Sequence, residues 1–405
     1  MKGNAYIPFM RRKGDGSTLN LDFTGGSLDS RVVLTRSAAT ATYINSSGYV
    51  TTAVANEARF EYNPTTLAAK GLLIEGSATN VLKYSVYADT NWNPFGGYTK
   101  SYTTGITSPA NDATAARITF SSVNHLLYTS NGLMGYTNSV GSVYTMSAWI
   151  RATTNTTNLK IRFGDANTTI GPDITISTTW TRYSYSYTAS SGSGPQLQSA
   201  SGTATGEFEM WGFQLELGTA ASSYIPTVAS QVTRNPDLAL MTSTNFSGWF
   251  TGGTTGTFFI DWHGGVRGIT STVRSVISTD DLSTKHLHLQ QVSAAGALKV
   301  ADFGAAHSVS TANTITSGAR TKGAFSFAYP GTGLTSTANL CLNGGTVATS
   351  SAIAFSVAPT WLVLGGVSST GTSLTDADTV LNGSIRQIKY YPTALTSAQL
   401  IEMTT

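Results

Sequence analysis

Threonine, serine and glycine dominate this chain and constrain its fold more than any other feature. The 405 residues include 64 Thr, 47 Ser and 41 Gly, together more than a third of the sequence. Thr is β-branched and favours extended backbone, Ser forms local hydrogen bonds that suit turns, and Gly weakens helix interiors. Because 40% of the residues are hydrophobic and 10% aromatic, the chain can still bury substantial cores. We therefore expect an all-β protein of several domains rather than a helical bundle, a doubly wound α/β enzyme or a disordered chain.

Charge and cysteine content exclude several kinds of partner. Charged residues make up 11% of the chain and the net charge is +3, so no basic field of the kind that nucleic-acid binding needs is present. The single cysteine, Cys341, leaves no internal disulfide and no multi-cysteine metal site, and we expect it to be buried. The chain has no run of about 18 apolar residues to span a bilayer, and its N-terminus lacks the apolar run of a secretory signal. We expect no nucleic-acid partner, no membrane insertion and no cofactor.

The hydrophobic pattern divides the chain into successive segments of β structure. Apolar and polar residues alternate at Tyr144–Arg151 and at Phe208–Glu216, which predicts strands with one face on a core. Such strands, separated by turns rich in Thr, Asn, Gly and Ser, are typical of β-sandwiches and jelly rolls. The expected division is an N-terminal anchoring arm at 1–20, a module of short strands and turns at 21–85, a jelly roll at 86–228, a linker at 229–255 and a β-sandwich at 256–405.

The C-terminal part carries two further local signals. Asn343-Gly344-Gly345 predicts a hairpin turn. Thr396-Ser-Ala-Gln399 matches a capping box ahead of two apolar residues, which predicts one short C-terminal helix. The expected architecture is therefore a set of tandem β-sandwich and jelly-roll domains with a short C-terminal helix.

Buried charge is the strongest physical constraint on the segment 21–85. Leu72–Ile74 is a wholly apolar run that needs burial on both sides, and Arg36 and Arg59 belong to the same module. A buried arginine without a carboxylate costs several kcal/mol, so we predict that at least one of the two pairs with a nearby glutamate. The candidate partners are Glu57, Glu61 and Glu75. A packing staple between two domains is the favoured interpretation, and a ligand-binding role is the alternative.

Candidate catalytic and metal-binding residues are sparse. Glycoside hydrolysis needs two carboxylates across a cleft, and Glu207 and Glu209 share one face of an expected strand. We interpret both as solvated residues and expect no enzymatic activity. His286 and His288 also share a face, but two imidazoles without a further ligand do not make a tetrahedral site. Glu216 is expected to hydrogen-bond a neighbouring loop or subunit.

Loop aspartates offer the other possible metal ligands. Asp280-Asp281 and Asp376-Ala-Asp378 are expected in loops where a hard cation such as Ca²⁺ could bind oxygen ligands. The sequence lacks any diagnostic loop spacing, so ordinary turn residues are the favoured interpretation.

Aromatic residues are the candidates for carbohydrate binding. The apolar C–H faces of sugars stack on Trp and Tyr, beside amide or carboxylate groups that bind the hydroxyls. Trp92 lies among loop-forming residues, and with Tyr98 it is a candidate for an exposed aromatic site. Tyr183 and Tyr185 are further candidates, because they share one face of an expected strand with Tyr187. That face could be a ligand surface, a subunit interface or a core edge.

Trp149 and Trp211 are expected in a hydrophobic core and not in a ligand site, because both lie within alternating strands.

Three segments resemble parts of known protein families. Arg36-Ser-Ala-Ala-Thr-Ala-Thr42, continuing through Ala55-Asn-Glu-Ala-Arg59 to Gly71-Leu-Leu-Ile-Glu75 and Thr79-Asn80, is similar to a module common in bacteriophage virion proteins. Trp211-Gly-Phe-Gln-Leu-Glu216-Leu-Gly218, ending in Ser223-Tyr-Ile-Pro-Thr227, resembles the closing strand of carbohydrate-binding-module-like jelly rolls in the same phage proteins. Leu381-Asn-Gly383-Ser-Ile385-Arg-Gln-Ile388-Lys-Tyr390, continuing to Leu400, is similar to the last strand and helix of concanavalin A-like, laminin-G-like sandwiches.

The resemblance implies a structural protein on the surface of a phage particle. Its expected role is that of a tail fibre or spike adhesin, assembled as a trimer, which binds host surface glycans without catalysis. A capsid head fibre or decoration protein with a mainly structural role is the alternative. Other tail or capsid proteins are the implied partners, and the basic residues of the N-terminal arm are candidates for virion anchoring. These residues are Lys2, Arg11, Arg12 and Lys13.

Overall fold

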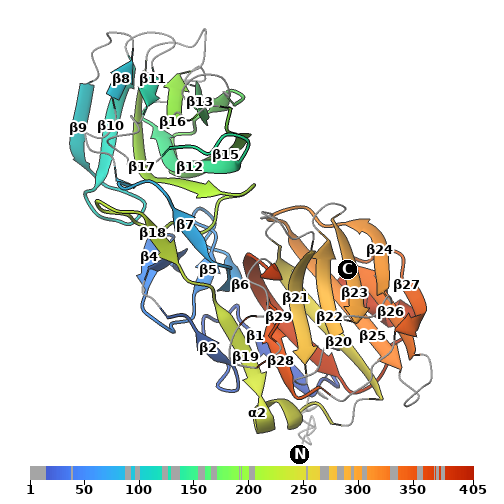
Figure 1. The fold of residues 1–405 in the computed structure, drawn as a ribbon. Helices are drawn as coiled ribbons and strands as arrows, with labels where there is room; N and C mark the ends of the chain where they lie inside the picture. Colours follow the sequence, from blue (N-terminus) through green and yellow to red (C-terminus); the bar gives the residue numbers. More distant parts are fainter. Residues whose placement is uncertain are drawn as a thin grey trace, which may run out of the picture.

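The computed structural model describes most of the chain and confirms an all-β fold. The described residues are 15–37, 40–86, 93–95, 101–120, 126–128, 137–153, 160–165, 171–190, 192, 194–199, 206–251, 254–264, 273–280, 287–292, 296–302, 308–328, 336–353, 359–368, 370, 374 and 379–405. Within them the chain forms antiparallel sheets and two short helices, α2 (Ser243–Ser247) and α3 (Ser397–Thr404). Two bodies are visible, a larger sandwich and a smaller jelly roll above it (Figure 1).

Two sheets packed face to face build the larger sandwich. One contains, in spatial order, β27 (Ala348–Ile353), β26 (Ser336–Leu342), β25 (Arg320–Ala328), β20 (Thr255–His263), β29 (Gly383–Tyr391), β6 (Ala69–Ile74) and β5 (Phe60–Tyr62), with β1 (Leu19–Asp22) also on β29. The other contains β2 (Val33–Thr35), β19 (Leu238–Thr242), β28 (Trp361–Leu364), β21 (Val273–Asp280), β22 (Leu287–Val292), β23 (Ala297–Asp302) and β24 (Ser308–Thr314). The inward side chains of both sheets form one hydrophobic core, as expected for aligned sheets.

The N-terminal segment completes these sheets instead of forming a sheet of its own. Strand β6 pairs with β29, with Leu72 opposite Ile385, and β2 pairs with β19. Leu72–Ile74 is buried as the sequence predicts, because β6 lies within a sheet that is covered on both sides. The segment 21–85, expected as a separate module, is therefore joined to the C-terminal sandwich.

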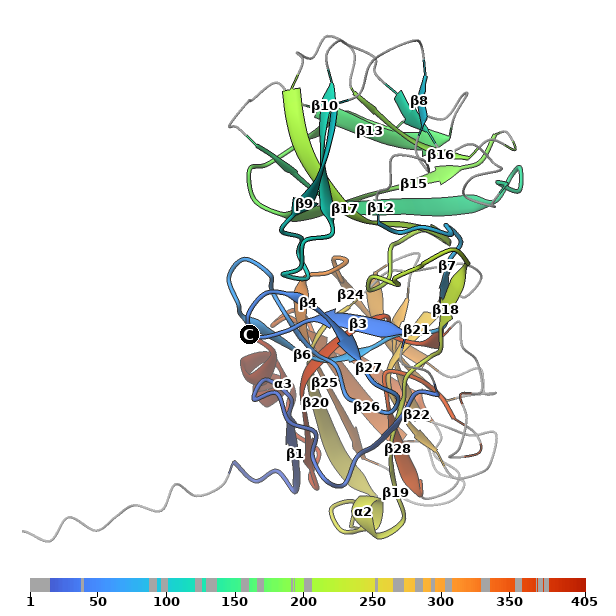
Figure 2. The ribbon, with the colours of Figure 1, turned by 90° about the vertical axis from the view of Figure 1, so that its left-hand side faces the viewer.

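The jelly roll is an insertion between two neighbouring strands of that assembly. Strand β7 (Ala78–Asn80) leads into it and β18 (Val232–Arg234) leads out, and the two pair with Arg234 opposite Ala78. Figures 1 and 2 both show this ribbon connecting the two bodies. One jelly-roll sheet contains β15 (Thr181–Thr188), β12 (Val143–Ala152), β17 (Gly206–Leu217), β10 (Ala115–Phe120) and β9 (Ser101–Ile106). The other contains β14 (Ile174–Thr175), β13 (Lys160–Asp165), β16 (Pro195–Ser199), β11 (Leu126–Tyr128) and β8 (Asn93–Phe95).

The segment 229–255 differs from the expected linker. It contains β18, β19 and α2, and β19 lies within a sheet between β2 and β28. The reason is the apolar run Leu238–Met241, which is buried on both faces.

Local signals near the C-terminus are confirmed. Thr396 caps α3 through a capping box in which its hydroxyl accepts from the Gln399 amide while the Gln399 side chain accepts from the Thr396 amide. Asn343 and Gly344 both adopt positive φ in the hairpin turn between β26 and β27. Cys341 is fully buried. Neither helix in the described part of the chain is long and apolar enough to cross a membrane.

Gly71 offers a test of how tightly β6 is held against β29. Its φ is +102°, and an added Cβ would overlap the backbone carbonyl of Ile385. We predict that Gly71→Ala lowers the free energy of unfolding by at least about 2 kcal/mol more than Gly141→Ala, measured by urea denaturation. Gly141 also has a positive φ, of +84°, but open space around it. Equal effects of the two substitutions would contradict the described packing.

Candidate functional site

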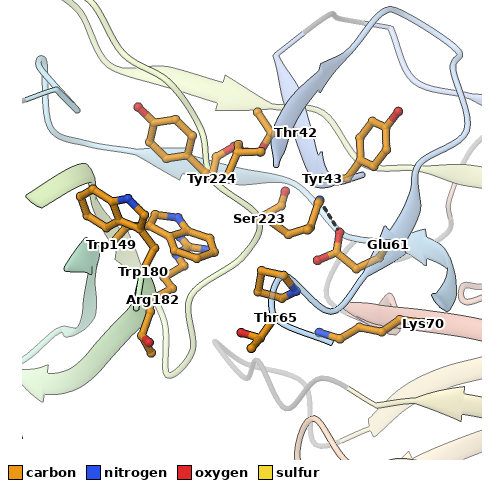
Figure 3. A pocket seen from close by; sticks show the side chains of 14 residues that line it. Thr42, Tyr43, Glu61, Thr65, Lys70, Trp149, Trp180, Arg182, Ser223 and Tyr224 are labelled. Carbon is orange, nitrogen blue, oxygen red and sulfur yellow. Dashed lines mark hydrogen bonds between the residues drawn. The ribbon is translucent and has the colours of Figure 1, made fainter. Parts of the chain in front are cut away.

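A cavity of about 310 Å³ lies between the jelly roll and the segment 21–85, which is called here the N-terminal module. Its lining comes from β3 (Ala41–Ile44), the start of β4 (Val50–Ala53), β5 and its following loop, β6, β12, β15 and the segment 223–224. Trp149, Trp180 and Arg182 lie on one side of it, and Glu61 and Lys70 lie on the other (Figure 3). Neither module alone supplies both sides.

Aromatic residues form the jelly-roll side of the cavity. Strand β12 is buried on both faces, because Met146, Ala148 and Ile150 belong to the jelly-roll core while Trp149 points to the opposite side. There Trp149 joins an apolar cluster between the two modules. The buried members of this cluster, called here the junction cluster, are Ile44, Val50, Ala115, Trp149, Trp211 and Tyr224. Trp149 and Trp211 are core residues as predicted, but the core is the one between the modules.

Trp180 is the most accessible tryptophan of the cavity wall. It is half-buried, and the Arg151 guanidinium lies over its ring at 4.7 Å from the centroid. Arg151 does not line the cavity, whereas Trp180 does. The indole is therefore held in place by the arginine while part of it faces the cavity.

The opposite wall carries a carboxylate and a cation. Glu61 on β5 accepts a hydrogen bond from the Ile44 amide at 2.9 Å, which fixes the carboxylate against β3. Burial raises the pKa of Glu61 to about 7, and neighbouring Glu75 acts in the same direction while Lys70 and Arg59 oppose the shift. Glu61 therefore changes charge near neutral pH.

Arg182 is a cation bound to neutral groups. Its Nη1 donates to the Ser222 carbonyl at 2.6 Å and its Nη2 donates to the Ser147 hydroxyl at 3.0 Å. Its Nε is buried and has no hydrogen-bond partner. Burial lowers the pKa of Arg182, because the lost hydration outweighs the opposing charges of Glu216, Glu75 and Glu61.

A buried ion network underlies the floor of the cavity. Arg59 donates to Glu75 at 2.7 Å and to Asp237 at 2.5 Å, and Arg36 donates to the other oxygen of Asp237 at 2.9 Å. Arg234 lies 3.5 Å from Glu75. All five side chains are nearly inaccessible to solvent. The Arg59–Glu75 pair confirms the prediction that one of the two arginines pairs with a nearby glutamate, whereas Asp237 was not foreseen.

Ser223 connects this network to the cavity. Its amide and hydroxyl both donate to Glu75, at 2.8 and 2.7 Å, and Arg59 donates to the hydroxyl at 3.0 Å. The adjacent Tyr224 carbonyl accepts from Thr42 at 2.5 Å. The segment that carries Arg36, Arg59 and Glu75 therefore contacts the segment Ser223–Thr227 through Ser223. This contact joins two domains, which is the packing staple that the sequence predicts.

Glu216 anchors the same segment from the jelly-roll side. It accepts from the Ser222 amide at 2.9 Å and from the Ser222 hydroxyl at 2.6 Å. The expected hydrogen bond to a neighbouring loop is confirmed.

The tyrosines proposed from the sequence pack against the jelly-roll core. Tyr183 and Tyr185 are half-buried at the edge of that core, and Tyr187 is buried within it. The Tyr183 hydroxyl accepts from the Ser177 amide at 2.9 Å. Of the three readings of this face, the structure shows the core edge. Trp92, Tyr98 and the arm residues Lys2, Arg11, Arg12 and Lys13 lie outside the described residues, so those expectations stay predictions.

The interpretation of Glu209 as a solvated residue is wrong. It is 3% exposed and accepts from Arg117 at 2.6 Å and from Arg151 at 2.5 Å. The reason is the register of β17, which places Glu209 directly opposite arginines on both neighbouring strands. Glu207 is exposed as expected.

Two of the expected metal-ligand candidates, His288 and Asp280, lie among the described residues. His288 is buried in β22, with its Nδ1 3.1 Å from the Gln290 amide nitrogen. Asp280 ends β21 and so lies in a strand, not in a loop. His286, Asp281, Asp376 and Asp378 lie outside the described residues. Among the described residues, no group of three or more His, Cys, Asp or Glu side chains gathers.

The alternation of residues around β15 is a local sequence signal for one wall of the cavity. Arg182 on β15 and Trp180, which directly precedes this strand, alternate with Tyr183 and Tyr185, so they project from the opposite face. The tyrosines occupy the core side, which leaves the Trp180 face free for the junction. Lys70 and Glu61 carry no comparable signal, since their approach to β15 depends on how the two modules dock.

Comparison with known proteins identifies no family. No protein-family model matches the sequence, and no curated protein is similar to it. Among solved structures, the chain is similar to the CBM40 of the Ruminococcus gnavus IT-sialidase, with 20% identity, 38% of this chain and 84% of that chain covered, and a TM-score of 0.28. It is also similar to the CBM22-1 xylan-binding domain of Paenibacillus barcinonensis Xyn10C, with 15% identity, 36% and 99% covered, and a TM-score of 0.28.

Mouse laminin α1 domains LG4-5 overlap a larger share of the chain. They cover 77% of this chain and 97% of their own length, with 11% identity and a TM-score of 0.24. These similar structures are therefore carbohydrate-binding modules and laminin G domains. Because the TM-scores are low, the architecture described here rests on the strand pairing of this chain.

The ion network predicts a large cost for removing one partner. Arg59→Met leaves Glu75 and Asp237 buried and short of a cation, so we predict a loss of about 3–5 kcal/mol in the free energy of unfolding. Arg31→Met is the matched control, because Arg31 pairs with Asp29 at a partly exposed site and should cost less than about 1 kcal/mol. Urea denaturation measures both. A smaller loss of unfolding free energy for Arg59→Met than for Arg31→Met would show that the network does not stabilise the fold.

The raised pKa of Glu61 predicts that the stability of the fold depends on pH. Its folded pKa of about 7 lies above the ordinary value of 4.5, so the folded state holds the proton more tightly than the unfolded chain. The stabilising contribution is complete at low pH and is lost as the pH rises from about 4.5 to about 7. The stability of the wild type relative to Glu61→Gln should therefore fall over that interval. If the difference in urea midpoint between the wild type and Glu61→Gln does not change with pH, the burial of this carboxyl is contradicted.

Proposed function

We propose that this chain binds glycans without catalysis, and that the cavity between the jelly roll and the N-terminal module is its binding site. The observation that carries the proposal is the facing arrangement of Trp180 and Trp149 with Glu61 and Lys70 across about 310 Å³. A sugar ring presents an apolar C–H face and a rim of hydroxyl groups. An aromatic wall opposite a carboxylate and an ammonium group complements both.

The carboxylates of the cavity support binding over hydrolysis. A glycoside hydrolase uses two carboxylates across the scissile bond. Glu61 is the sole carboxylate among the described residues that line the cavity. Glu207 and Glu209, which share one face of β17, do not line it, and Glu209 is held by two arginines.

The biological setting follows from the sequence resemblance and belongs to the proposal. We propose a trimeric tail fibre or spike on the surface of a phage particle, attached through the arm at 1–20. A single cavity of this size gives modest affinity, and several copies on one particle would raise the overall affinity without new contacts. Immunogold labelling of the C-terminus on virions tests the setting. Label on the tail supports it, and label on the capsid lattice favours a head fibre or decoration protein.

Substitution of Trp180 tests the binding site. We predict that Trp180→Ala weakens binding to the oligosaccharides that the wild type retains on a glycan microarray by at least about tenfold, which is about 1.4 kcal/mol. Trp92→Ala is the control, because the cavity account gives Trp92 no role. Loss of binding with Trp92→Ala but not with Trp180→Ala would contradict the assignment. So would a wild type that retains no oligosaccharide.

A further inference from the structure

We propose that the saccharide bound in this cavity is acidic, and that its carboxylate is the missing counter-charge of Arg182 and Lys70. The inference rests on the proposed function and adds the chemical class of the ligand.

Most of the other arginines in the described residues are paired with carboxylates. Five partly exposed ones and the buried Arg36 and Arg59 bind Asp or Glu within 2.9 Å. The five are Arg31, Arg117, Arg151, Arg162 and Arg320. The cavity departs from this pattern.

Arg182 has no ion-pair partner among the described residues. Its hydrogen bonds go to a carbonyl and a hydroxyl, and its buried Nε donates to nothing. A half-buried guanidinium that is bound only to neutral acceptors is stabilised by a nearby anion, because charge-assisted hydrogen bonds are stronger than neutral ones.

Lys70 supplies a second cation on the opposite wall. It lines the cavity beside Thr65 and forms no ion pair with any residue that the structure describes (Figure 3). Glu61, the sole carboxylate among the described lining residues, is bound to the Ile44 amide instead. The described lining of the cavity therefore holds two cations and one carboxyl group, whose charge is partly suppressed at neutral pH.

These charges favour a carboxylate-bearing saccharide over a neutral one. The ring can lie on the aromatic wall that includes Trp180, while the carboxylate approaches the flanking cations. Neutralisation of Glu61 at lower pH removes the repulsion that an acidic ligand would meet. The charged and titratable groups around Glu61 are Lys70 on β6, Glu75 directly after β6, Arg59 ahead of β5, Arg182 on β15 and Tyr43 on β3.

Matched pairs of oligosaccharides test the inference. Trigalacturonate, a hyaluronan tetrasaccharide and sialyllactose are titrated into the intact protein by calorimetry, each beside its methyl ester, in which a methyl group removes the negative charge of every carboxylate. We expect at least one acid to bind at least tenfold more tightly than its ester. Lys70→Met should remove most of that preference and Lys70→Arg should retain it, with thermal melting confirming that both variants fold.

A second readout uses pH. The affinity for the acidic probe should rise as the pH falls from 8 to 6, and Glu61→Gln should make it nearly independent of pH over this range. The affinity of the methyl ester should not change. A rise that persists in Glu61→Gln would contradict the role given to this carboxyl.

The inference can fail while the proposed function survives. Esters that bind as tightly as their acids, in a manner that depends on Trp180, would overturn the acidic class and keep a glycan site. Absence of binding to all three acids would also overturn it. If the microarray retains no saccharide at all, the proposed function falls as well.

Discussion

Two buried carboxylates, Glu75 and Asp237, hold together chain segments that are far apart in sequence. Through Arg36 and Arg59 they tie the N-terminal module to the strand that follows the jelly roll, and through Ser223 they reach the jelly-roll exit. A buried charge that loses its partner is costly, so this geometry tolerates little displacement of any of the three segments. The network thereby sets where the inserted jelly roll sits.

The cavity is a consequence of that placement. The junction cluster joins the modules by apolar contact. The ion network fixes their relative orientation, because its hydrogen-bonded ion pairs form only in one geometry. Where the contact ends, aromatic residues of the jelly roll face Glu61 and Lys70 of the N-terminal module. A site formed between modules depends on their docking, so ligand binding and the stability of the junction are coupled.

The fold class and local elements could be predicted from the sequence, whereas the pairing of distant segments could not. Alternation identified strands such as β12 and β17, and the capping box identified α3, because these signals are local. The strands on either side of the jelly-roll insertion join Thr79 to Thr233, 154 positions apart, and Arg36 and Asp237 are 201 positions apart. Alternation predicted that Trp149 lies in a core, but it could not tell the jelly-roll core from the cluster between the modules. On β15, the face that lines the cavity is the one opposite the tyrosines.

Hydrogen–deuterium exchange of the intact protein, with and without a saturating oligosaccharide, tests the two-module site most directly. The account predicts that exchange slows together in residues 42–44, 61–70, 180–182 and 222–224, which line one cavity or hold its wall. Protection confined to the C-terminal sandwich, or to the jelly roll without the N-terminal module, would contradict it.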